Sequence, residues 1–136
     1  MRVRCVKNSI ASIEGTSARE RIQRSINLDG PINDLTVRRD YGVQALEERD
    51  GGLWFYLHTV PVSDYPYPYP AELFELLDNS IPEGWGIGFQ DQPERGAVAW
   101  KRISFSAWAN SDHFYERLVE GEAIAVALYQ RMKAKP

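Results

Sequence analysis

Residues 41–60, with the sequence YGVQALEERDGGLWFYLHTV, decide the expected fold because they read as two strands joined by a tight turn. Tyr41, Val43 and Ala45 alternate with glycine and glutamine, which is the period of a half-buried strand. The dipeptide Asp50-Gly51 follows, and it favours a hairpin turn because both central positions of such a turn require positive φ. The return strand over 53–60 carries apolar side chains on both faces, so we expect both faces to be covered.

Further elements are expected on either side of this hairpin. Short strands are predicted over 2–6, 85–89 and 97–103, and in the strand over 85–89 large side chains alternate with glycine. The strands over 85–89 and 97–103 are expected to form a second hairpin. A helix is predicted over 19–28, with Thr16 or Ser17 as its N-cap and a turn at Asp29-Gly30-Pro31 as its end. More helices follow residue 104. The sequence thus predicts an α+β fold: a strongly bent antiparallel sheet or SH3-like barrel with an N-terminal helix and C-terminal helices.

Two segments between the hairpins each fit two interpretations. Four of the eight prolines fall in 61–70, and proline restricts both itself and its predecessor to extended backbone. This segment therefore reads either as a rigid strap with tyrosine rings laid on the sheet or as an aromatic surface for a partner. Residues 71–79 fit a helical stripe and a strand equally well, because nine residues are too few for periodicity to decide.

The predicted core follows from the apolar faces of these elements. Its members are Val43, Phe55, Leu57, Ile87, Phe89, Val98, Phe114, Leu118, Ile124 and Leu128. In the last helix, Ile124, Leu128 and Met132 form the expected buried stripe.

Length and composition limit the class of protein. A chain of 136 residues is expected to form a single domain over 1–136 that folds without a metal or disulfide. The one cysteine, Cys5, lies in a strand-like run and is expected to pack as a small hydrophobic residue. The lack of disulfides predicts a cytoplasmic protein, and no apolar run is long enough to enter a membrane. We expect no cofactor.

Charge is distributed unevenly along the chain. Between Asp50 and Glu94 there are eight acidic residues and no lysine or arginine, although the whole chain has a net charge of only −3. Such a block is either a solvated face or a surface that attracts a basic partner, and it opposes nucleic-acid binding because phosphates would be repelled. The acidic and aromatic residues expected to bind a basic protein partner are Asp64, Tyr65, Tyr67, Tyr69, Glu72, Glu75, Asp78, Trp85, Asp91 and Glu94.

Catalytic patterns are weak in this sequence. The two histidines, His58 and His113, lie in no recognisable nucleophile elbow; His58 is expected to be packed or hydrogen-bonded and His113 to lie at the surface. Glu72 and Glu75 form a carboxylate pair of the kind that acid–base enzymes use, but such pairs are common on surfaces. No metal-ligand spacing occurs.

Three strings carry a resemblance to a known group of proteins: DGGLWFY at 50–56, PAELFELLD at 70–78 and ISFSAW at 103–108. In these strings and in its layout the chain resembles small bacterial immunity proteins that accompany polymorphic or contact-dependent toxins. The resemblance implies a cytoplasmic inhibitor that binds one toxin domain tightly. The lack of a catalytic constellation favours a non-catalytic role, and the acidic block predicts a basic toxin domain, such as one that attacks nucleic acid. It transfers no functional residue, because no residue-level motif is matched. An SH3-like small-ligand or adaptor module and an acid–base enzyme stay open as alternatives.

Overall fold

The central hairpin forms as its sequence predicts in the computed structural model, which describes residues 1–26 and 30–134. β2 spans Asp40–Arg49 and β3 spans Gly52–Leu57, with Arg49 paired to Gly52. The turn residues Asp50 and Gly51 have φ of 50° and 73°, the positive values that this turn requires. Local turn chemistry therefore sets the register of the longest strand pair.

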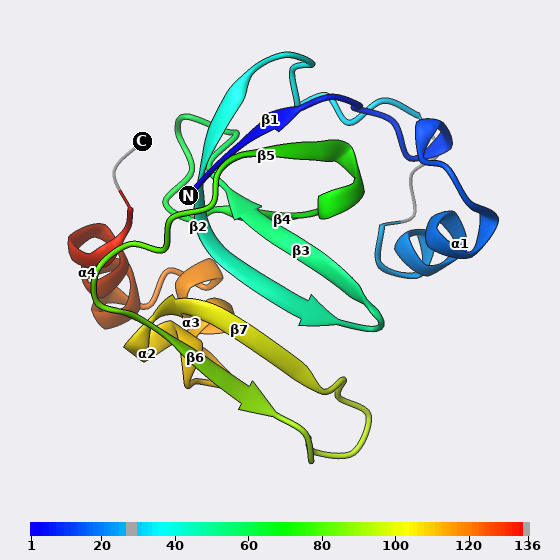
Figure 1. Cartoon of the computed structure of the whole chain (residues 1–136). Helices are drawn as coiled ribbons and strands as arrows, with labels where there is room; N and C mark the ends of the chain where they lie inside the picture. Colours follow the sequence, from blue (N-terminus) through cyan, green and yellow to red (C-terminus); the bar gives the residue numbers. More distant parts are fainter. Residues whose placement is uncertain (27–29, 135–136) are drawn as a thin grey trace.

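β2 is long enough to pair with two different strands along one edge. Its first residues pair with β1 (Arg2–Cys5) and its last with β7 (Trp100–Phe105), while β3 runs along its other edge. The sheet therefore forks at β2 (Figure 1). One branch ends in β5 (Phe74–Asp78) beside β1, and the other ends in β6 (Trp85–Gln90) beside β7.

The resulting fold is α+β with a seven-stranded antiparallel sheet. β4 (Tyr67–Pro70) lies beside β3, so the main path runs β4-β3-β2-β1-β5. Among the described residues β4 and β5 are not paired to each other, and the sheet is not closed into a barrel. The SH3-like alternative was wrong on this point, because the chain passes from β4 to β5 through a single 3-10 turn, Ala71–Leu73 (η2), instead of continuing one ladder.

The N-terminal helix is α1, Thr16–Ser25, preceded by a 3-10 turn at Ile10–Ser12 (η1). Its N-cap is Gly15, with φ of 93°, so the predicted caps Thr16 and Ser17 were wrong; both lie inside the helix. Glycine occupies the cap because that backbone conformation is strained for other residues. The predicted helix end at Leu28 and the turn residue Asp29 lie outside the described residues.

Three helices follow β7: α2 (Ser106–Ala109), α3 (Phe114–Val119) and α4 (Ala123–Met132). In Figure 1 they lie together beside the β6–β7 hairpin, while α1 lies at the opposite side of the sheet. Within the described part of the chain, no helix is long and apolar enough to span a bilayer.

Two apolar clusters pack against β3, in which residues 54–57 are all buried. Phe55 belongs to the cluster that includes Ile10 and Ile22 from the N-terminal helices. The neighbouring Tyr56 belongs to the second cluster, which includes Trp108, Leu118 and Tyr129 from the C-terminal helices. The expectation that the return strand is covered on both faces is confirmed.

Half of the predicted core is buried and much of the rest is exposed. Val43, Phe55, Leu57, Phe114 and Leu118 are buried, and Leu128 is partly buried against the second cluster. Four predictions were wrong: the exposed fractions are 68% for Ile87, 66% for Phe89, 53% for Val98 and 77% for Ile124.

The errors on β6 have one structural cause. A Cβ on Gly88 would lie 1.8 Å from the carbonyl oxygen of Ala109, so α2 sits on the glycine face of the strand. Ile87 and Phe89 project from the opposite face, which no helix covers among the described residues. In α4, the buried positions are Ala125 and Tyr129, which turns Ile124 toward solvent. Met132, also predicted in the buried stripe, is 41% exposed.

Candidate functional site

The strongest candidate for a binding site is the β6–β7 surface. We define this surface by the exposed side chains of Ile87, Phe89 and Val98 together with the loop carboxylates Asp91 and Glu94. Cross-strand pairing places Ile87 opposite Ile103 and Phe89 opposite Lys101. Single exposed apolar residues are ordinary, but several on one hairpin indicate an interaction surface.

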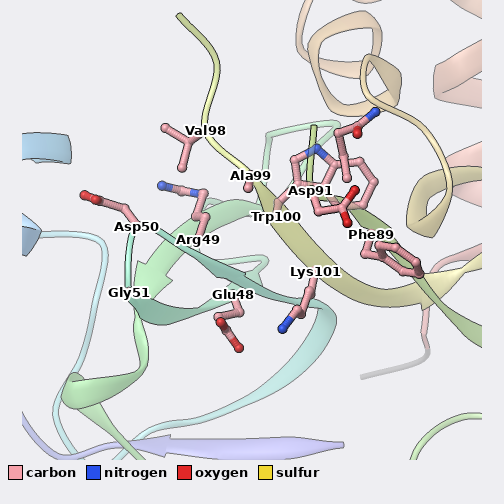
Figure 2. Close-up of a pocket in the computed structure, with 11 residues that line it drawn as sticks. Glu48, Arg49, Asp50, Gly51, Phe89, Asp91, Val98, Ala99, Trp100 and Lys101 are labelled. Atoms are coloured by element: carbon pink, nitrogen blue, oxygen red, sulfur yellow. The ribbon is translucent and has the colours of Figure 1, made fainter. Parts of the chain in front are cut away.

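Two clefts adjoin this surface, one on each side of the segment from Val98 to Trp100. The first, of about 320 Å³, lies between that segment and the β2–β3 turn. Figure 2 shows its side chains arriving from three segments: Glu48–Asp50 at the end of β2, Phe89 and Asp91 at the end of β6, and Val98–Lys101 at the start of β7. The cleft is lined by acidic and basic groups together with the apolar side chains of Phe89, Val98, Ala99 and Trp100.

The second cleft, of about 410 Å³, lies toward α3. Its aromatic walls come from Tyr56, Trp100 and Tyr115, and its outer carboxylates are Glu94, Asp112 and Glu116. His113 pairs with Glu116 at 3.4 Å. A cationic side chain of a partner would meet carboxylates and ring surfaces in this cleft.

A buried ion-pair network forms the floor of the second cleft. Arg102 donates from Nε to Glu47 at 2.7 Å and from one terminal nitrogen to the carbonyls of Trp108 and Ser111, both at 2.8 Å. Glu47 also accepts from Arg49 at 2.7 Å and from the Tyr56 hydroxyl at 3.1 Å. Burial, with the nearby Glu47 carboxylate, raises the pKa of Tyr56 far above its usual range. The network fixes the α2–α3 connection to the sheet.

The predicted tyrosines lie on and around β4, away from the β6–β7 loop. Tyr69 is buried, its hydroxyl lies 2.5 Å from that of Thr59, and burial raises its pKa to about 12. Tyr65 and Tyr67 are half-buried and contact each other edge to face, with ring centroids 5.2 Å apart. Tyr115 of α3 donates to the carbonyl of Pro66 at 2.7 Å. This geometry favours the strap interpretation for Tyr69 and leaves one side of Tyr65 and Tyr67 exposed.

The three predicted acidic residues of η2 and β5 have partners within the chain. Glu72 forms an ion pair with Arg21, and Glu75 lies 3.7 Å from Arg4. Asp78 accepts a hydrogen bond from the Ser80 backbone at 2.9 Å. Hydrogen bonds from Ser80 lower the pKa of Asp78.

The remaining predicted residues are divided between the two regions. Asp64 is exposed in the segment before β4, and Trp85 is half-buried against the second apolar cluster. Asp91 lines the first cleft and Glu94 the second, so these two lie on the same loop. In Figure 1 that loop is well separated from β5. The structure therefore brings Asp91 and Glu94 together and places Glu72, Glu75 and Asp78 elsewhere.

Sequence reasoning missed Ile87, Phe89 and Val98 as surface residues. The alternation of Ile87 and Phe89 with glycine was a usable signal, since it marks one face of β6 for close approach by another element. The sequence does not say which face that element takes.

His58 is hydrogen-bonded, as predicted: its Nε2 lies 2.6 Å from the hydroxyl of Tyr129. Burial, and secondarily Lys133, lowers the pKa of His58. A lowered folded-state pKa stabilises the fold above the unfolded value of about 6.5, and this stability is lost as the pH falls below it.

We therefore expect His58→Gln to flatten the dependence of unfolding free energy on pH between about pH 7 and pH 5.5. Chemical denaturation at several pH values measures this slope. An unchanged slope in His58→Gln would contradict the assignment.

Within 1–26 and 30–134, no three or more His, Cys, Asp or Glu side chains are grouped to hold a metal ion. No protein-family model, curated protein or solved structure matches the chain.

Proposed function

We propose that the chain is a non-catalytic, immunity-type inhibitor that works in the cytoplasm and neutralises a basic toxin domain through the β6–β7 surface. The observation that carries this proposal is the gathering of exposed Ile87, Phe89 and Val98 beside Asp91 and Glu94. Buried apolar anchors supply most of the affinity of a protein interface. Acidic groups around them accelerate encounter with a basic partner and fix its orientation.

A nuclease toxin would suit such a surface. Its active site must carry positive charge to hold phosphates, so an inhibitor with carboxylates at its rim is attracted to the surface that it must block. The segment from Asp50 to Glu94 contains no lysine or arginine. Arg95 and Lys101 lie at the edge of the surface, and Lys101 is the cross-strand neighbour of Glu48, which offsets its charge.

A small-ligand binding module is the second candidate, favoured by the second cleft alone. Its aromatic walls and the carboxylates Glu94, Asp112 and Glu116 would suit a small organic cation.

Co-expression with the product of the neighbouring gene tests the inhibitor proposal. If that product arrests bacterial growth, this chain should restore growth and form a stoichiometric complex whose association slows as salt is raised. Phe89→Ala should weaken the complex by about 30-fold or more, as expected for an interface anchor. Ile124→Ala, another exposed apolar truncation on α4, should leave affinity unchanged.

Growth arrest that this chain fails to relieve would contradict the inhibitor role. If the Phe89→Ala variant instead forms the complex with wild-type affinity, the inhibitor role stands but the β6–β7 surface is not its binding site.

A further inference from the structure

We propose that β6 is a docking edge for strand addition, on which an extended, lysine- or arginine-rich segment of a partner protein forms an additional antiparallel strand. The inference rests on the proposed function only for the statement that the partner is a protein. It adds the mode of binding and the chemistry of the segment that is bound.

The backbone of β6 presents hydrogen-bonding groups away from β7. The Trp85 N–H donates to the carbonyl of Pro82 at 3.2 Å, so it does not face β7. In an antiparallel ladder, successive residues direct their N–H and C=O groups to opposite sides. The N–H and C=O of Ile87 and Phe89 therefore also point away from β7, while those of Gly86 and Gly88 point toward it. Throughout the described chain, β6 pairs with no strand other than β7.

This edge lacks the features that protect the other two edges of the sheet. β4 contains Pro68 and Pro70, which have no N–H to offer, and β5 carries Glu75 and Asp78. Prolines and charges are the usual protection of an edge strand against pairing. β6, with the sequence WGIGFQ, has neither, and its Ile87 and Phe89 side chains are exposed.

The edge is also held rigidly before any partner arrives. All six residues of β6 are in register with β7, without a bulge. On the glycine face of β6, Ala109 of α2 packs directly against Gly88. A preformed edge reduces the conformational entropy that binding must overcome, so main-chain hydrogen bonds can contribute to affinity.

Charge at the two ends of β6 selects the partner. Glu83 precedes the strand, Asp91 and Glu94 follow it, and Arg95 is the one basic residue between positions 79 and 96. Lys101, opposite Phe89, is also cross-strand neighbour to Glu48, which offsets its charge.

A second copy of this chain fits the edge less well than a basic segment. If two copies paired antiparallel along β6, Glu83 of one copy would approach Asp91 and Glu94 of the other, and like charges would repel. A segment with lysine or arginine flanking its apolar positions instead meets carboxylates at both ends.

Amide hydrogen exchange on the full chain tests this inference, with a ten-residue peptide of alternating lysine and valine as the probe. In the free protein, the amides of Ile87 and Phe89 should exchange faster than those of Gly86 and Gly88. Saturation with the peptide should slow exchange at Ile87 and Phe89 at least about tenfold. A peptide of alternating glutamate and valine should have no effect.

Two results of the exchange experiment on the wild-type chain would overturn the inference. One is that the lysine peptide leaves Ile87 and Phe89 unprotected. The other is that these amides are protected in the protein alone and lose protection on dilution, which would mean that a second copy occupies the edge.

The variant Ile87→Pro removes one outward N–H and none that faces β7, so circular dichroism and thermal unfolding should show an intact fold. It should abolish peptide-induced protection at Phe89, whereas Ile87→Ala, which keeps the N–H, should retain it. Protection that survives in Ile87→Pro overturns strand addition.

This test and the growth assay fail independently. If the Ile87→Pro variant relieves growth arrest as well as the wild-type chain does, the inhibitor role stands and the docking edge is excluded. If the lysine peptide protects the amides of Ile87 and Phe89 but the chain relieves no growth arrest, the docking edge stands and the inhibitor role is excluded.

Discussion

Replacing Arg102 with alanine is expected to lower the free energy of unfolding by about 3–5 kcal/mol, because it leaves the buried Glu47 carboxylate without its main counter-charge. Glu47 and Arg102 are both almost fully buried and lie 2.6 Å apart at their closest. The substitution also removes the donor to the carbonyls of Trp108 and Ser111, which tie α2 and its following loop to the sheet. Urea denaturation followed by circular dichroism measures the loss.

Two variants show whether the buried geometry is the cause. Arg24→Ala breaks an ion pair with Asp50 that is largely exposed, and such pairs contribute about 0–1 kcal/mol. Arg102→Lys keeps the charge, but one ammonium cannot reach three acceptors in different directions, so its stability should fall between wild type and Arg102→Ala. Equal losses in Arg24→Ala and Arg102→Ala would show that burial of the network is unimportant.

The central hairpin could be predicted from sequence because its determinants are local. Asp50-Gly51 requires one turn type, and that turn fixes the pairing of Arg49 with Gly52. The strand at 74–78 could not be distinguished from a helix in the same way. Its conformation is determined by pairing with β1, about 70 residues earlier in the chain, and nothing in the periodicity of its own residues reports that partner.

The acidic block between Asp50 and Glu94 could be recognised in the sequence, but its division into separate surfaces could not be predicted. Glu72 meets Arg21 and Glu75 meets Arg4 across more than 50 positions of the chain. These contacts occupy carboxylates that in the sequence look the same as Asp91 and Glu94. A count of charges predicts the sign of a surface, whereas the pairing of individual charges depends on the fold.

Which face of β6 is exposed also depends on a contact between separate elements, namely that of α2 with Gly88. Alternation of Trp85, Ile87 and Phe89 with glycine predicted a strand with one face for close approach, and that prediction is confirmed by α2 lying on Gly88. The further step, that the large side chains are core, was wrong. The chain after β7 turns onto the glycine face, and the sequence of β6 alone does not determine the direction of that turn.

Gly88→Ala should accordingly be the most disruptive single-methyl addition in β6. Its Cβ would lie 1.8 Å from the Ala109 carbonyl oxygen and 3.0 Å from the Asn110 nitrogen, and both contacts are with backbone that cannot rotate away. Overpacking of this kind costs about 1–3 kcal/mol, and more where the backbone must shift. Thermal or chemical unfolding of the variant measures the cost.

Gly86→Ala is the matched control, because it adds the same methyl to the same strand where no atom lies within 4 Å of the new Cβ. Alanine restricts the unfolded chain more than glycine does, so this variant should be neutral or more stable by about 0.4–1 kcal/mol. A neutral Gly88→Ala would mean that α2 does not lie on the face of β6 that Gly86 and Gly88 share. That outcome would bury Ile87 and Phe89 again and remove the surface on which the proposed binding depends.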